Sequence, residues 1–212
     1  LVALVNLQFA ADNLHRSGTR VRVGHARISP PGRSTVIAGL VAGLRRWVGA
    51  TRPPQQDCRS MRLVAAIECI LNQNARDPGA ANSPACNEAI VRLCTDHQVG
   101  IVQIPCPEKE CLGLRRPRPP GTSIRQTLDT PGGRRCCADL ADSIADRLCD
   151  YQRNGYRVLA VLGGNAQSPG CAIAAEWSGL SPASGVFMQE LQRALRERNM
   201  DMPMRGIRDA DP

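Results

Sequence analysis

The segment Arg62-Leu-Val-Ala-Ala-Ile-Glu-Cys69 decides the fold, because it places a short apolar run directly before a cysteine. The same pattern returns at Val99–Pro105, which precedes Cys106, and at Val158–Leu162, which leads through a glycine-rich loop to Cys171. Apolar runs of this length, bounded by turn residues, are typical of buried strands. We therefore expect three β-strands, each with a cysteine beyond its carboxyl end.

Helical patterns lie between and after these strands. The spacing of apolar residues predicts helices over 83–97, over 135–154 and from Ser184 onward, with a long Pro- and Arg-rich loop over 105–133. Met202–Ile207 is expected to form a last short strand. Strands that alternate with helices favour an α/β fold, here a single Rossmann-like domain with a mostly parallel sheet flanked by helices.

The charge of the chain is unevenly distributed. Of 212 residues with a net charge of +8, residues 1–60 hold nine Arg against two Asp, giving +7. Residues 61–212 hold 18 Lys and Arg against 17 Asp and Glu, giving +1. We expect residues 1–60 to be an Arg- and Pro-rich extension that is either disordered or not native, and residues 61–212 to form the functional domain.

Composition excludes several classes of partner. The expected domain is nearly neutral and only 3% of the chain is aromatic, so a nucleic-acid partner is unlikely. No apolar stretch approaches the roughly 20 residues that span a bilayer. Ten cysteines without a recognisable signal peptide favour a cytoplasmic, reducing compartment, where clustered cysteines serve metal binding or catalysis rather than disulfides. The oligomeric state stays open.

If the fold is correct, Cys69, Cys106 and Cys171 meet in one crevice, because ligands of parallel sheets bind beyond the carboxyl ends of the strands. Three thiolates around one pocket suit an iron–sulfur cluster that leaves one iron without a protein ligand. Glu108 would project beside this site as a general acid or base. The plainer interpretation of this carboxylate is an ion pair with one of three nearby arginines, Arg115, Arg116 or Arg118.

Ser168 and Cys111 leave alternatives open. Ser168 would hydrogen-bond a substrate or a cluster sulfide, although most serines in such loops cap turns. Cys111 follows Cys106 at a spacing that would allow it to be a fourth ligand. The cluster would then be closed, and the protein would be a non-enzymatic iron–sulfur or redox-sensing module. In a third hypothesis the cysteines are only buried apolar residues of an α/β scaffold.

Four segments together carry a family resemblance: Cys69-Ile-Leu-Asn-Gln-Asn74, Gly100-Ile-Val-Gln-Ile-Pro-Cys-Pro-Glu108, Gly113-Leu-Arg-Arg-Pro117 and Ser168-Pro-Gly-Cys171. On these segments, residues 61–212 resemble the thiouracil desulfurase family of small α/β iron–sulfur proteins. The family usually has Ser-Pro-Ser-Cys-Gly where this chain has Gly170 and Ala172, so that one hydroxyl is lost and the backbone after the cysteine is restricted.

The resemblance implies a fold, a cofactor and a reaction. Cys69, Cys106 and Cys171 would hold a [4Fe–4S] cluster whose open iron takes the sulfur of a thiolated pyrimidine such as 2-thiouracil. The sulfur would leave as hydrosulfide, and the oxo base would remain. Glu108 and Ser168 match the residues that assist this reaction in the family. The expected partner is therefore a small thiolated nucleobase or a related thiocarbonyl compound.

Overall fold

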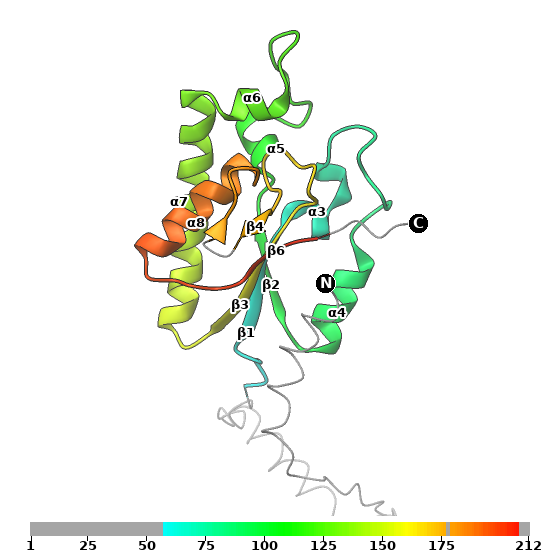
Figure 1. Ribbon diagram of the computed structural model, residues 1–212. Helices are drawn as coiled ribbons and strands as arrows, with labels where there is room; N and C mark the ends of the chain where they lie inside the picture. Colours follow the sequence, from blue (N-terminus) through cyan, green and yellow to red (C-terminus); the bar gives the residue numbers. More distant parts are fainter. Residues whose placement is uncertain (1–56, 177–178, 208–212) are drawn as a thin grey trace, which may run out of the picture. The chain divides into compact units, whose positions relative to one another are not determined.

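Four parallel strands form the central sheet of the computed structural model, which describes residues 57–176 and 179–207 (Figure 1). In chain order the strands are β1 (Arg62–Ile67), β2 (Gly100–Ile104), β3 (Arg157–Gly163) and β6 (Met204–Gly206). Their order in the sheet is β2-β1-β3-β6, and every pairing is parallel. The chain therefore runs from β1 to one side first and to the other side afterwards, which makes a switch point between β1 and β3.

Helices cover both faces of this sheet, so the predicted α/β fold is confirmed. Helix α4 (Glu88–Asp96) connects β1 to β2 on one face, whereas α7 (Pro131–Arg153) and α8 (Val186–Glu197) lie together on the other face (Figure 1). Right-handed crossovers require this division, because the connections that follow β2 and β3 run in the opposite direction to the connection that follows β1.

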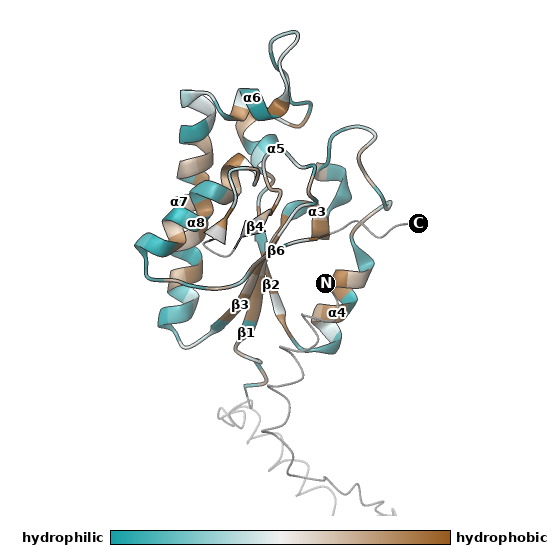
Figure 2. Cartoon of the chain, in the orientation of Figure 1, coloured by the Kyte–Doolittle hydropathy of each residue, from teal (hydrophilic) through white to brown (hydrophobic). Residues whose placement is uncertain are grey.

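The core lies between the sheet and the helix pair α7–α8. Leu63–Ile67 are all buried, as expected for a central parallel strand with both faces covered. From α8, the apolar side chains Phe187, Met188, Leu191 and Leu195 face this core, as their spacing predicts. Figure 2 shows the same division, with hydrophobic strands and helices that are hydrophilic on their outer sides.

The helix predicted over 83–97 begins later than expected. It starts at Glu88, with Asn87 as N-cap, and the Asn87 side chain accepts a hydrogen bond from the Ile90 N–H at 3.1 Å. Ser83 instead donates to the Cys86 carbonyl oxygen at 2.7 Å and closes a local turn. The Asn87 N–H donates to the Ile70 carbonyl oxygen (2.8 Å), which anchors this turn beside the end of β1.

The prediction of one long loop over 105–133 is wrong, because this stretch contains two short helices. Helix α5 (Pro107–Leu112) begins with proline at its first position, where the missing N–H costs nothing. Helix α6 (Ile124–Leu128) is started by a capping box between Ser123 and Gln126.

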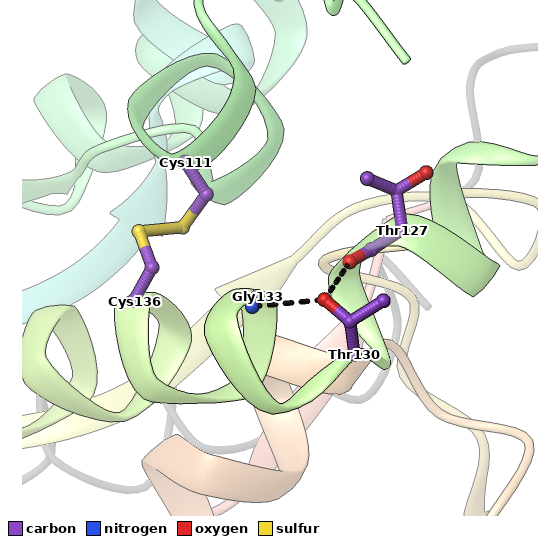
Figure 3. Close-up of a disulfide and its surroundings, with 5 residues drawn as sticks. All are labelled: Cys111, Thr127, Thr130, Gly133 and Cys136. Atoms are coloured by element: carbon purple, nitrogen blue, oxygen red, sulfur yellow. Dashed lines mark hydrogen bonds between the residues drawn. A yellow bond between two sulfur atoms is a disulfide. The ribbon is translucent and has the colours of Figure 1, made fainter. Parts of the chain in front are cut away.

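Two further helix starts differ from the prediction. Helix α7 begins at Pro131, before the predicted Arg135, and its N-cap Thr130 accepts from the Gly133 N–H (Figure 3). The N-cap of α8 is Gly185, because the Ser184 hydroxyl is bonded to the backbone of Ala174 instead.

The remaining elements are short. After β1 come α3 (Glu68–Leu71) and the 3-10 helix η1 (Gln73–Ala75), and after β3 comes an antiparallel pair, β4 (Ala175–Glu176) and β5 (Gly179–Leu180). The described residues from Ser60 onward group into one compact unit. The expected extension over 1–60 lies outside the described residues, apart from 57–60. Within the described part of the chain, no helix combines the length and hydrophobicity needed to span a bilayer.

Candidate functional site

One cavity of about 410 Å³ lies beyond the carboxyl ends of β1, β2 and β3. All five predicted site residues line it: Cys69, Cys106, Glu108, Ser168 and Cys171. The topology accounts for this convergence, because parallel strands deliver the segments that follow them to the same edge of the sheet.

The three cysteines come from three different segments of the chain. Cys69 lies in α3 and is partly exposed, whereas Cys106 directly precedes α5 and Cys171 follows β3, both buried. None of the three is disulfide-bonded. Burial raises the pKa of the Cys106 thiol, and it raises the pKa of Cys171 well above its ordinary value. The neighbouring sulfurs of Cys69 and Cys106 raise the Cys171 pKa further, as expected for three thiols that share one cavity.

Glu108 is fixed at the cavity wall through both carboxylate oxygens. It lies in the first turn of α5, and its side chain is buried. Its Oε2 accepts a hydrogen bond from Arg116 Nε at 3.1 Å. Its Oε1 accepts from Ser168 Oγ at 3.1 Å and from the Gly170 N–H at 3.3 Å. The expected ion pair with one of the three arginines is therefore present, and the same carboxylate also faces the cysteines.

Ser168 connects the carboxylate to a sulfur. Its Oγ lies 3.1 Å from Glu108 Oε1 and 3.0 Å from Cys171 Sγ. It also accepts from the Cys171 N–H at 3.3 Å, so it caps a turn as well. A hydroxyl has only one proton to donate, so Ser168 bonds as donor to either Glu108 or Cys171, not to both.

The sequence prediction left open which of three arginines pairs with Glu108, and it missed a second charged residue beside the site, Glu68. Arg116 is 1% exposed and donates to Glu108 as well as to the sulfur of Cys106, at 3.6 Å. Glu68 is also buried, and its carboxylate accepts from the Cys106 N–H (2.8 Å) and from Lys109 Nζ (2.6 Å). The spacing of the arginines could not show which of them turns inward. Glu68 could have been found, because an acidic residue directly after a buried strand lies at the sheet edge where the site forms.

Glycines allow close approach around Cys171. A Cβ at Gly164 would lie 2.5 Å from Cys171 Sγ, and a Cβ at Gly170 would lie 2.8 Å from Pro107 Cγ and 3.2 Å from Glu108 Cγ. The helix α8 holds the same loop, because the Phe187 N–H donates to the Gly170 carbonyl oxygen at 3.1 Å. Gly170 therefore replaces the serine usual in the resembled family at a point where this backbone has no room for a side chain.

The proposal of Cys111 as a fourth cluster ligand is wrong for this structure. Cys111, at the end of α5, forms a disulfide with Cys136 in α7 (Figure 3). Both sulfurs are thereby used, and Cys111 does not line the cavity. The expectation that the cysteines serve metal or catalysis rather than disulfides is also wrong for this pair, whose partners lie 25 residues apart in the sequence.

Thiols are the candidate donors for a metal at this site. Among the residues that the structure describes, no three His, Cys, Asp or Glu side chains are grouped so that they could hold a single metal ion. A cluster differs in this respect, because each cysteine binds a different iron and the sulfurs need not converge on one point. Three thiols around one cavity fit such a cluster in number and in chemical type.

Comparison with known proteins finds a distant relative. The chain is 25% identical over 142 residues to the uncharacterized protein MJ0003 of Methanocaldococcus jannaschii. The match covers 67% of this chain and 83% of that protein. No family model and no solved structure matches the chain. The fold and the geometry of the cavity therefore carry the functional argument.

Proposed function

We propose that this protein is an iron–sulfur-dependent desulfurase that removes sulfur from a thiolated pyrimidine such as 2-thiouracil, or from a related small thiocarbonyl compound. The observation that carries this proposal is the convergence on one cavity of Glu108, Ser168 and three cysteines that form no disulfide. A volume of about 410 Å³ lies within the usual range for small-molecule sites.

Cys69, Cys106 and Cys171 would hold the [4Fe–4S] cluster. When bound through three cysteines, such a cluster supplies a Lewis-acidic iron with affinity for the soft sulfur of a thiocarbonyl group. The buried positions of Cys106 and Cys171 keep water away from two of the three thiols. Because Gly164 has no side chain, the Cys171 sulfur fits beside its backbone.

Glu108 is proposed to act as the base. In the overall reaction, water adds to the thiocarbonyl carbon, the C–S bond breaks, and the products are the oxo base and hydrosulfide with one proton released. Oε2 of Glu108 is bound to Arg116, and Oε1 is bonded to Ser168 and to the Gly170 N–H. Oε1 would take a proton from water when the Ser168 hydroxyl donates to Cys171 Sγ instead. Ser168, which lies beside the same Oε1, would orient the water or the substrate there.

An anaerobic preparation tests this function. We expect about four irons and matching sulfide per chain, an electron paramagnetic resonance signal on reduction, and sulfide release from 2-thiouracil. Single Cys→Ser variants at Cys69, Cys106 and Cys171 should lose iron. Cys86→Ser is the matched control, because Cys86 is free and does not line the cavity.

Two results would contradict the proposal in different ways. If the cluster forms but no thiolated base loses sulfur, the substrate is wrong and the cofactor stands. If the preparation is colourless and free of iron although it is well folded, the cofactor is wrong, and the cysteines are buried thiols of a scaffold. A cytoplasmic location stays a prediction that fractionation of the native source would check.

A further inference from the structure

Arg116 is the only buried cation in the described part of the chain. It is also the only one of the three neighbouring arginines whose guanidinium turns into the cavity wall. The backbone at this position is strained, because Arg116 has a φ of +46°, which is unusual for a residue other than glycine. A strained backbone and a fully buried charge together indicate a site-specific role.

The guanidinium distributes its N–H groups over three segments. Nε donates to Glu108 Oε2 at 3.1 Å, and Nη1 donates to the Leu114 carbonyl oxygen at 2.7 Å. Nη2 donates to the Ala75 carbonyl oxygen at 2.6 Å and to Cys106 Sγ at 3.6 Å. One rigid group therefore contacts the proposed base and a proposed cluster ligand at the same time.

We propose that Arg116 is a positioning residue that orients Glu108 and that raises the reduction potential of the cluster through its charge and its N–H bond to Cys106 Sγ. This inference rests on the proposed function. The potential of an iron–sulfur cluster depends on nearby charge and on hydrogen bonds to its sulfurs. Reduction adds negative charge, so a buried cation in contact with a ligand sulfur stabilises the reduced form.

Two other described cations near the site are less well placed. Arg76 also lines the cavity, but it is only partly buried, so its charge is better screened. Lys109 is the nearest alternative in α5, but its Nζ is bound to Glu68 at 2.6 Å and to Glu110 at 3.1 Å. Its side chain is also 28% exposed, so its charge is better screened. A lysine at position 116 would keep the charge, yet its single ammonium group could not reproduce the planar fork that serves Glu108 and Cys106 together.

The test compares anaerobically prepared full-length protein with Arg116→Gln, Arg116→Lys and the control Arg115→Gln. Arg115 is exposed, so the control removes the same charge one residue away, where solvent screens it. The cluster is titrated with dithionite and followed by electron paramagnetic resonance. Iron content and thermal unfolding are measured in parallel, and sulfide release from 2-thiouracil gives kcat and KM.

For Arg116→Gln we expect the midpoint potential to fall by about 59 mV, which is about a tenfold change in a one-electron reduction constant. Arg116→Lys should shift less, because the charge remains, and Arg115→Gln should match the wild type. Loss of kcat at nearly constant KM is expected for both Arg116 variants. If Arg116→Gln fails to fold, the potential of Arg116→Lys decides, with any clear fall relative to Arg115→Gln supporting the proposal.

The outcomes separate this inference from the function on which it rests. A cluster whose potential is the same in the Arg116 variants and in Arg115→Gln overturns the role of Arg116 alone. A shifted potential without any desulfurase activity supports that role and overturns the proposed substrate. A wild-type protein that binds no iron overturns both.

Discussion

At the scale of single residues, the site is a set of buried polar groups that satisfy one another. Both oxygens of Glu108 are bonded, one to Arg116 and one to Ser168 and the Gly170 N–H. Buried polar groups left without such partners would be strongly destabilising. The role of Glu108 can therefore be tested with a substitution of nearly identical shape.

Glu108→Gln should lower kcat for sulfide release by roughly 10²–10⁴-fold, because an amide cannot take a proton from water. The iron content should not change, since Gln does not alter the three cysteines. The matched control is Glu110→Gln in the same helix, where the carboxylate is exposed and pairs with Lys109. Equal activity of the two variants would remove Glu108 from the reaction.

Gly170→Ser restores the residue usual in the resembled family and should destabilise this protein. Its Cβ would lie 2.8 Å from Pro107 Cγ, so α5 or the loop must shift, at a cost of about 1–3 kcal/mol. Urea unfolding measures the difference. Gly132→Ser is the control, because nothing lies within 4 Å of a Cβ there. A stability equal to that of the control would mean that the loop adapts without cost.

At the scale of elements, the short helix α5 and its N-cap supply two of the five site residues. Its N-cap is Cys106, its first turn holds Glu108, and its last turn is joined to α7 through Cys111. A helix this short is not stable by itself. Its position therefore depends on the disulfide and on its packing against α6 and α7.

Breaking the disulfide should lower the free energy of unfolding by about 3 kcal/mol, because the unfolded chain regains the freedom of a loop of 25 residues. The double variant Cys111→Ser/Cys136→Ser, unfolded with urea, measures this change. Cys86→Ser serves as control for the loss of a thiol. If the double variant is as stable as the control, the bond does not constrain the unfolded chain.

Helices α7 and α8 are joined by ion pairs that should depend on pH. Arg198 Nε bonds to Asp146 Oδ1 at 2.7 Å, and this bond lowers the pKa of Asp146 below its ordinary value of 3.8. A lowered pKa in the folded state stabilises the protein above the unfolded value, and that stabilisation is lost as the pH falls through the folded pKa.

Asp146→Asn should therefore reduce the free energy of unfolding slightly at neutral pH, and the difference from wild type should vanish on acidification below pH 3.8. Asp139→Asn, on an exposed part of the same helix, is the control. Urea unfolding at a series of pH values gives the comparison. A difference that stays constant down to low pH would rule out the ion pair as its source.

At the scale of the whole molecule, the start of α8 contributes both to the core and to the site. Phe187 is fully buried in the core at the start of α8, and its N–H holds the Gly170 carbonyl oxygen beside Cys171. Phe187→Ala should cost about 3–5 kcal/mol through lost burial and the cavity left behind. Thermal unfolding measures the loss. Leu114→Ala, at a side chain 57% exposed, should change stability by less than about 0.5 kcal/mol.

The sequence predicted the sheet better than it predicted the connections. Apolar runs before Cys69 and Cys106 located β1 and β2, and the parallel topology then brought the cysteines to one cavity. The stretch 105–133 was misjudged, because its prolines and arginines resemble those of a loop although Pro107 and Pro131 start helices. The choice of Arg116 among the three arginines and the Cys111 disulfide could not be predicted for another reason: both depend on tertiary contacts that no local pattern encodes.

The covalent link between Cys111 and Cys136 also bears on how this protein is handled. Thiol reductants are routine additives wherever oxygen-sensitive metal centres are purified. Here the same additive would open the bond that fastens the helix bearing Glu108 to its larger neighbour α7. Protection of the proposed metal centre should therefore come from the exclusion of oxygen and not from reductants. An anaerobic preparation without thiols or phosphines keeps both the metal centre and the disulfide.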